Sequence, residues 1–136
     1  MKTKWLAIGL VVTAFLMLTA CSSLPDQVSI DASSSGKTVN IAVGGTLTVT
    51  LDSNVTTGYS WELKEIGDTN VLQKSDNKYI APTSGAIGAG GKEVWTFKAL
   101  AAGTSTLTMS YSQPWAGGQK DAKSFSLTVV VKQVTK

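Results

Sequence analysis

TLTVTL, residues 46–51, places Leu47, Val49 and Leu51 on one parity and three threonines on the other. Successive side chains of a β-strand point to opposite faces of a sheet, so this alternation predicts a strand with one buried and one exposed face. No stretch of the chain shows a helical period that competes with this pattern. The fold is therefore expected to be built from strands.

The same period of two extends along the chain from residue 37. Further runs occur at 94–99 (VWTFKA), 105–111 (STLTMSY) and 125–131 (FSLTVVV), with weaker ones at 39–43, 60–66 and 71–79. The breaks between them hold turn residues, among them Gly44-Gly45, Gly67-Asp68, Ala101-Ala102-Gly103 and Gly117-Gly118. About seven short strands within roughly 100 residues predict an all-β sandwich, with a small barrel as the alternative.

The beginning of the chain has a different character. Lys2 and Lys4 precede an uncharged apolar run over 6–18. A basic start followed by a short apolar core predicts an export signal peptide over residues 1–20. A membrane span would need about 20 apolar residues, and this run is shorter.

Leu18-Thr19-Ala20-Cys21 closes this segment and resembles a bacterial lipobox. The resemblance implies that Cys21 carries a diacylglyceryl group and, after cleavage before it, an acyl chain such as palmitate on its amine. Several acyl chains, at about 0.8 kcal/mol per buried methylene, give a stable membrane anchor. A free cysteine beside a conventional cleavage site is the alternative. As the only cysteine, Cys21 also rules out an internal disulfide.

Ser22 follows the cysteine where an Asp would signal retention, which in Gram-negative bacteria fits sorting to the outer membrane, facing the periplasm or the cell surface. The polar stretch over 22–36 holds Pro25 and three consecutive serines. We therefore expect residues 21–36 to form a lipidated, flexible tether and residues 37–136 to form the folded domain. Val28 and Ile30 could add a short edge strand.

Composition excludes several kinds of site. Without residues 1–20, ten lysines face nine acidic residues, a net charge of +1, so no nucleic-acid partner is expected. The absence of His and Arg excludes His-based triads, His metal sites and Arg clamps. Asp52 with Glu62 is the nearest approach to a carboxylate pair and is interpreted as solvated charge. We expect a monomer that is not an enzyme and holds no metal or cofactor.

Three loops differ from ordinary turns. In NVTTGYSW, residues 54–61, Asn54 can fold the loop entry through its side chain, the threonine hydroxyls can bond back to the loop, and Gly58 can take φ > 0. Plain polarity is the alternative for the threonines. The parity of Trp61 predicts a core position, and packing under the loop is the favoured role of Tyr59.

The other two loops each carry one large apolar residue. APTSGAIGAGG, residues 81–91, holds Ile87, which either folds back or anchors the loop in an apolar pocket of a partner. SQPWAGG, residues 112–118, is stiffened by Pro114. Trp115 either packs over the sandwich edge or serves as a binding hot spot, where tryptophan is enriched.

Taken in order, the three loops resemble those of the chagasin family, proteinaceous inhibitors of papain-like cysteine proteases. The family's Asn-Pro-Thr-Thr-Gly-aromatic-x-Trp, Gly-x-Gly-Gly and Arg-Pro-Trp motifs correspond to Asn54-Val55-Thr56-Thr57-Gly58-Tyr59-Ser60-Trp61, Gly88-Ala89-Gly90-Gly91 and Gln113-Pro114-Trp115. The likeness covers residues 37–132. It implies an immunoglobulin-like sandwich whose three loops form a wedge for the protease cleft.

In that wedge, the resemblance implies that Thr56 and its neighbours face the catalytic Cys/His pair. Ile87 and the glycines after it would enter the substrate side, and Trp115 would lie on the other side against an aromatic of the enzyme. Two residues depart from the family pattern. Val55 replaces a proline, which leaves the first loop less restricted, and Gln113 replaces an arginine, which removes a cation from the rim.

A membrane-anchored structural or adhesive sandwich is the alternative function. The two hypotheses differ in where Thr56, Ile87 and Trp115 lie. If these residues share one exposed apolar edge, inhibition is favoured. If all three pack inward, the structural role is favoured.

Overall fold

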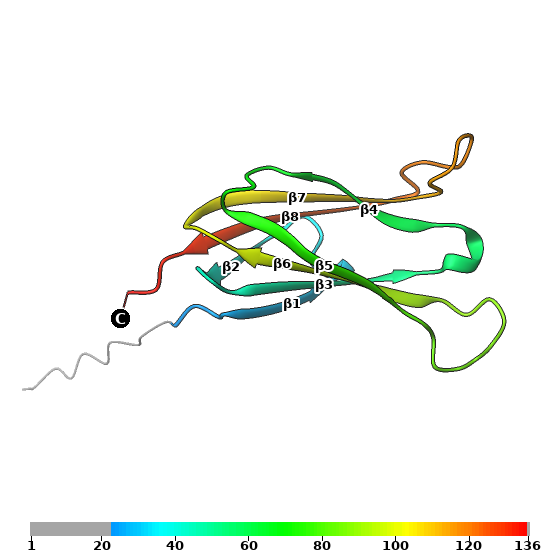
Figure 1. Ribbon diagram of the computed structural model, residues 1–136, viewed down its shortest axis with the longest axis horizontal. Helices are drawn as coiled ribbons and strands as arrows, with labels where there is room; N and C mark the ends of the chain where they lie inside the picture. Colours follow the sequence, from blue (N-terminus) through cyan, green and yellow to red (C-terminus); the bar gives the residue numbers. More distant parts are fainter. Residues whose placement is uncertain (1–22, 136) are drawn as a thin grey trace, which may run out of the picture.

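The computed structural model describes residues 23–135, which form an all-β sandwich of two sheets (Figure 1). Within these residues lie eight strands and two single-turn 3₁₀ helices. They are β1 (Gln27–Asp31), η1 (Ala32–Ser34), β2 (Lys37–Ala42), β3 (Thr46–Ser53), η2 (Val55–Thr57), β4 (Ser60–Ile66), β5 (Leu72–Ile80), β6 (Gly91–Ala99), β7 (Gly103–Ser112) and β8 (Lys123–Lys132). The sandwich is the predicted fold class, and all seven expected strands are present.

The two sheets have the strand orders β1-β3-β6-β5 and β2-β8-β7-β4. The pairs β1–β3 and β2–β8 are parallel, and the other pairs are antiparallel. The core between the sheets is filled by the side chains of one parity from each strand, as the alternation predicts. Among the fully buried ones are Ile41, Leu47, Val49, Leu51, Leu72, Phe97, Leu107, Met109, Phe125 and Val129.

The eighth strand, β1, lies within the segment expected to be a flexible tether. Val28 pairs with Leu47 and Ile30 with Val49, and both side chains pack against the core. The alternation of these two apolar residues is enough to extend the sheet by one edge strand. The folded part therefore begins at residue 27, earlier than the boundary expected at residue 37, and the edge strand suggested by Val28 and Ile30 is confirmed.

The register brings three connections to one end of the sandwich. At that end Ser53 pairs with Gly91, Ser60 with Ser112, and Tyr111 with Lys123. The β3–β4, β5–β6 and β7–β8 connections thus lie together, opposite the start of β1 and the end of β8 (Figure 1). We call them the first loop (54–59), the second loop (81–90) and the third loop (113–122).

The expected signal peptide and Cys21 lie outside the described residues. Over residues 23–135, the structure contains no helix of the length and apolarity that a membrane crossing requires.

Candidate functional site

The first loop is held in shape by Asn54. Its Oδ1 accepts a hydrogen bond from the Thr56 backbone N–H at 3.2 Å and another from the Thr56 hydroxyl. The Thr57 hydroxyl donates to the Asn54 carbonyl at 2.6 Å. Gly58, at φ 80°, closes the turn by donating its N–H to Val55. The loop geometry expected for Asn54, the threonines and Gly58 is therefore confirmed, with Val55 and both threonines exposed.

An aromatic cluster supports this loop from below. Tyr111 stacks on Tyr59 and packs against Trp61, with 5.2 Å between the ring centroids in each pair. The Tyr111 hydroxyl also accepts the Asn54 backbone N–H at 2.8 Å. Trp61 is buried, as predicted, and Tyr59 is half-buried under the loop, which is the packing role favoured from its sequence.

The second loop presents a fully exposed isoleucine. The relative exposure of Ile87 is 106%, so its side chain does not fold back onto the domain. Gly88 follows at φ 78°, and its carbonyl accepts a hydrogen bond from the Asn54 Nδ2 at 2.9 Å. Gly91 is buried, and a side chain there would overlap Tyr79 and the carbonyl of Ile80. Gly88 is thus required by its backbone conformation and Gly91 by close packing, whereas a side chain at Gly90 would meet its neighbours only at ordinary contact distance.

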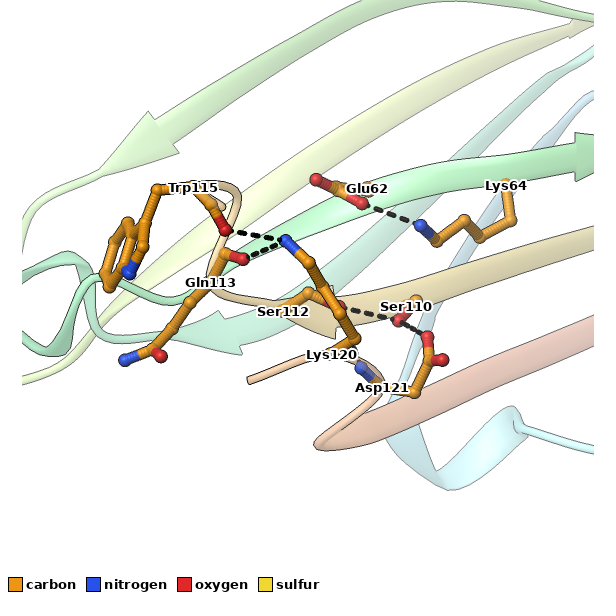
Figure 2. A network of polar contacts seen from close by, with 8 residues as sticks. All are labelled: Glu62, Lys64, Ser110, Ser112, Gln113, Trp115, Lys120 and Asp121. Carbon is orange, nitrogen blue, oxygen red and sulfur yellow. Dashed lines mark hydrogen bonds and ion pairs between the residues drawn. The ribbon is translucent and has the colours of Figure 1, made fainter. Parts of the chain in front are cut away.

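The third loop is closed on itself by a lysine. Figure 2 shows the Lys120 ammonium between two backbone carbonyls, those of Gln113 and Trp115. Backbone bonds from Gln113 to the Gln119 carbonyl and from Gly118 to the Trp115 carbonyl complete the closure. Trp115 is 49% exposed, and the six-membered ring of its indole lies against Gly58 of the first loop.

Gln113 connects the third loop to the first. Its Nε2 donates to the Thr57 carbonyl at 3.3 Å, and its Oε1 accepts the Gln119 backbone N–H at 2.9 Å. The hydroxyl of Tyr59 also bonds to the side chain of Gln119. Together with the contact between Trp115 and Gly58, these bonds join the two loops. Since Asn54 joins the first loop to the second, the three loops form one connected end.

The base of the third loop contains a small polar network (Figure 2). The Ser110 hydroxyl bonds to the Asp121 carboxylate and lies 3.0 Å from the Ser112 hydroxyl, which accepts the Asp121 N–H at 2.9 Å. Asp121 has φ 50°, a conformation that Asp tolerates better than most residues. Nearby, the hydrogen bond that Lys64 donates to Glu62 at 2.8 Å raises the pKa of the Lys64 ammonium.

Several residues of this site were not identified from the sequence. Gln119, Lys120 and Asp121 show no pattern before the loops are folded. The side chain of Glu93 is buried beneath the first loop. Glu93 directly precedes VWTFKA and has the same parity as Trp95 and Phe97, whose side chains lie in the core. A charged residue at a core parity is the signal that could have identified it. Within residues 23–135 no group of three acidic, His or Cys side chains is arranged for a metal.

Fold and site together define a class: a small immunoglobulin-like sandwich that presents three mutually braced loops at one end. Residues 40–129 match the model of the chagasin family peptidase inhibitors, I42. The chain is 35% identical to chagasin of Trypanosoma cruzi over 96 residues, which cover 68% of this chain and 86% of that protein.

Two solved structures share the fold. The cysteine protease inhibitor EhICP2 from Entamoeba histolytica has a TM-score of 0.66 at 23% identity, covering 78% of this chain and 95% of its own. PbICP-C, solved in complex with falcipain-2, has a TM-score of 0.59 at 19% identity, covering 85% of this chain and 96% of its own. The chain belongs to the chagasin family and is a cysteine peptidase inhibitor, not an enzyme.

Proposed function

We propose that this protein inhibits papain-like cysteine proteases reversibly, by inserting its three loops as a wedge into the active-site cleft. The observation that carries the proposal is the exposure of Thr56, Ile87 and Trp115 on loops that are bonded to one another at one end. A structural module would be expected to pack these side chains inward, and the full exposure of Ile87 argues against that alternative.

The wedge works by filling the cleft with a surface that offers no chemistry to the enzyme. The first loop, with Thr56 at its turn, faces the catalytic Cys/His pair. Ile87 fills an apolar pocket on the substrate side, and Trp115 lies against the opposite wall. The complex of the related fold PbICP-C with falcipain-2 supports this class of partner.

The internal bonds of the loops favour tight binding. A loop that is already fixed in its bound shape loses little conformational entropy on association. The Thr56 and Thr57 hydroxyls are satisfied within the loop, so docking does not strip them of water without compensation. These bonds offset the loss of the family proline at Val55.

Titration of a papain-like protease with the purified protein tests the proposal. We expect competitive, reversible inhibition by an inhibitor that stays uncleaved. Protease whose catalytic cysteine has first been blocked by a bulky covalent reagent is the control, and it should bind weakly. Equal binding to free and blocked protease would place the contact outside the cleft and contradict the wedge.

The role of Gln113 leads to a separate prediction. Gln113→Ala removes one bond to Thr57 and one to Gln119, and we expect inhibition constants about 3- to 10-fold higher, as one or two lost hydrogen bonds imply. Gln113→Arg restores the family cation but offers no acceptor for the Gln119 N–H. A rim charge contributes about 0 to 1 kcal/mol, so the gain and the loss nearly cancel.

Inhibition constants for the three forms against one protease decide this point. The arginine form should lie close to the native protein and the alanine form above both. If the alanine form inhibits as well as the native protein, the hydrogen bonds of Gln113 to Thr57 and Gln119 are not needed for inhibition. If the arginine form inhibits much better than the native protein, the cation that Gln113 replaces is important for binding.

We further propose that Cys21 is lipidated after export and holds the protein on the outer membrane. Because β1 begins at the end opposite the loops, an anchor before it leaves the loops facing away from the membrane (Figure 1). Cells labelled with radioactive palmitate should yield a labelled protein in the membrane fraction, and Cys21→Ser should abolish the label. A native protein that is unlabelled and released from the membrane would contradict the proposal.

A further inference from the structure

Glu93 is a carboxylate in a core position. It lies on β6 at the same parity as Gly91, Trp95 and Phe97, and its relative exposure is 7%. Among residues 23–135 no other charged side chain is buried. Burying a carboxylate is unfavourable unless it is hydrogen-bonded, so its partners explain its presence.

Those partners are the two ends of the first loop. Glu93 Oε1 accepts a hydrogen bond from the Ser53 hydroxyl at 2.7 Å and another from the Trp61 backbone N–H at 3.0 Å. Ser53 is the last residue of β3, and Trp61 is the second residue of β4. The carboxylate therefore contacts the chain just before and just after the loop.

No β-ladder hydrogen bonds join the two ends of the first loop to each other. The strands β3 and β4 belong to different sheets, where Ser53 pairs with Gly91 and Trp61 with Tyr111. The two ends are linked besides by the Trp61 Nε1, which donates to the Asp52 carbonyl at 3.0 Å. Hydrogen bonds to a carboxylate are stronger than hydrogen bonds between neutral groups, so Glu93 is well suited to hold the two ends of the first loop at a fixed separation.

We propose that Glu93 is a positioning residue for inhibition, which holds the first loop in its binding shape from beneath. The inference rests on the proposed function of the loops. Glu93 is buried and offers no surface to a protease, so its effect must pass through Ser53 and Trp61. A purely structural role makes a different forecast. Removing the acceptor leaves the buried Ser53 hydroxyl and Trp61 N–H unpaired, which would lower the free energy of unfolding while the dissociation rate of the complex and the order of residues 55–58 stay native.

Three variants separate these roles. Glu93→Met keeps the side-chain volume and removes the oxygen that accepts both hydrogen bonds. Glu93→Gln keeps an oxygen that can accept from both donors. Ser53→Ala removes one donor and leaves the Trp61 bond. Each is measured for thermal unfolding, for the dissociation rate of its complex with a papain-like protease, and for NMR order parameters of residues 55–58.

We expect Glu93→Met to unfold cooperatively, to dissociate about tenfold faster and to lose order in residues 55–58, since affinity changes within one interface lie mostly in the dissociation rate. Glu93→Gln should stay within about threefold of the native rate and rescue the order, and Ser53→Ala should fall between them. Native rates and native order in Glu93→Met would overturn the inference. So would a glutamine form as weak as the methionine form.

The role of Glu93 and the inhibitory function of the loops can fail separately. If Glu93→Met does not fold, the glutamine and Ser53→Ala forms decide, and a Ser53→Ala form with native order and native rate would refute the role of Glu93. If the native protein inhibits no papain-like protease, the proposed function is wrong. The order parameters of residues 55–58 then still show whether Glu93 fixes the loop.

Discussion

Trp115→Ala should weaken the inhibition of a papain-like protease by about 30-fold or more while leaving the free energy of unfolding nearly unchanged. Truncating a tryptophan hot spot costs at least about 2 kcal/mol, and 1.4 kcal/mol is a factor of ten. Half of the indole is exposed for contact, and the other part packs on Gly58, so alanine removes both a contact and a brace of the first loop. The measurement is the inhibition constant beside a denaturant titration.

Leu100 provides the matched control for this prediction. It is exposed to a similar degree, 46% against 49% for Trp115, but follows β6 at the opposite end of the sandwich. Leu100→Ala should inhibit like the native protein. Native inhibition by Trp115→Ala, or an equal loss in both variants, would contradict the assignment of the binding surface to the loop end.

Gly58→Ala should lower inhibition more than tenfold, with only a modest loss of stability. An L residue in the left-handed conformation costs about 1 to 2 kcal/mol, and Gly58 has φ 80°. The added methyl group would also overlap the Trp115 indole. Either the turn of the first loop or the tryptophan must move, so two binding elements are displaced by one methyl group.

A control substitution at Gly44 separates the effect of backbone strain from the effect of displacing Trp115. Gly44 has φ 83°, no atom lies within 4 Å of the position a methyl group would take, and it lies in the turn between β2 and β3 at the other end. Gly44→Ala should lose comparable stability and keep native inhibition. If the two alanine variants inhibit equally well once stability is considered, the contact between Gly58 and Trp115 has no part in binding.

The strands could be predicted because alternation is a local property. Seven runs predicted seven strands, and β1 was only suggested because two apolar residues, Val28 and Ile30, make a short pattern. The self-contained bonds of the first loop were also foreseeable, since Asn54, Thr56 and Thr57 are close in sequence.

The connections between loops could not be predicted, because they join residues far apart in the chain. Asn54 bonds to Gly88, Thr57 to Gln113 and Tyr59 to Gln119 only when the register has brought three strand ends together. The direction of Ile87 likewise depends on the fold of its loop. The charge of Glu93 at a core parity could have marked it as unusual, but its partners Ser53 and Trp61 are brought beside it only by the fold.

The central claim is that one end of the sandwich, with all three loops, contacts the protease. Hydrogen exchange of the native protein, free and with excess papain-like protease, tests it most directly. We expect slower exchange of the backbone amides at 54–59, 84–90 and 113–119, and unchanged exchange at the opposite turns 43–45, 67–71 and 100–102. Slowing confined to the opposite turns or to the outer face of a sheet, with the three loops unaffected, would contradict it.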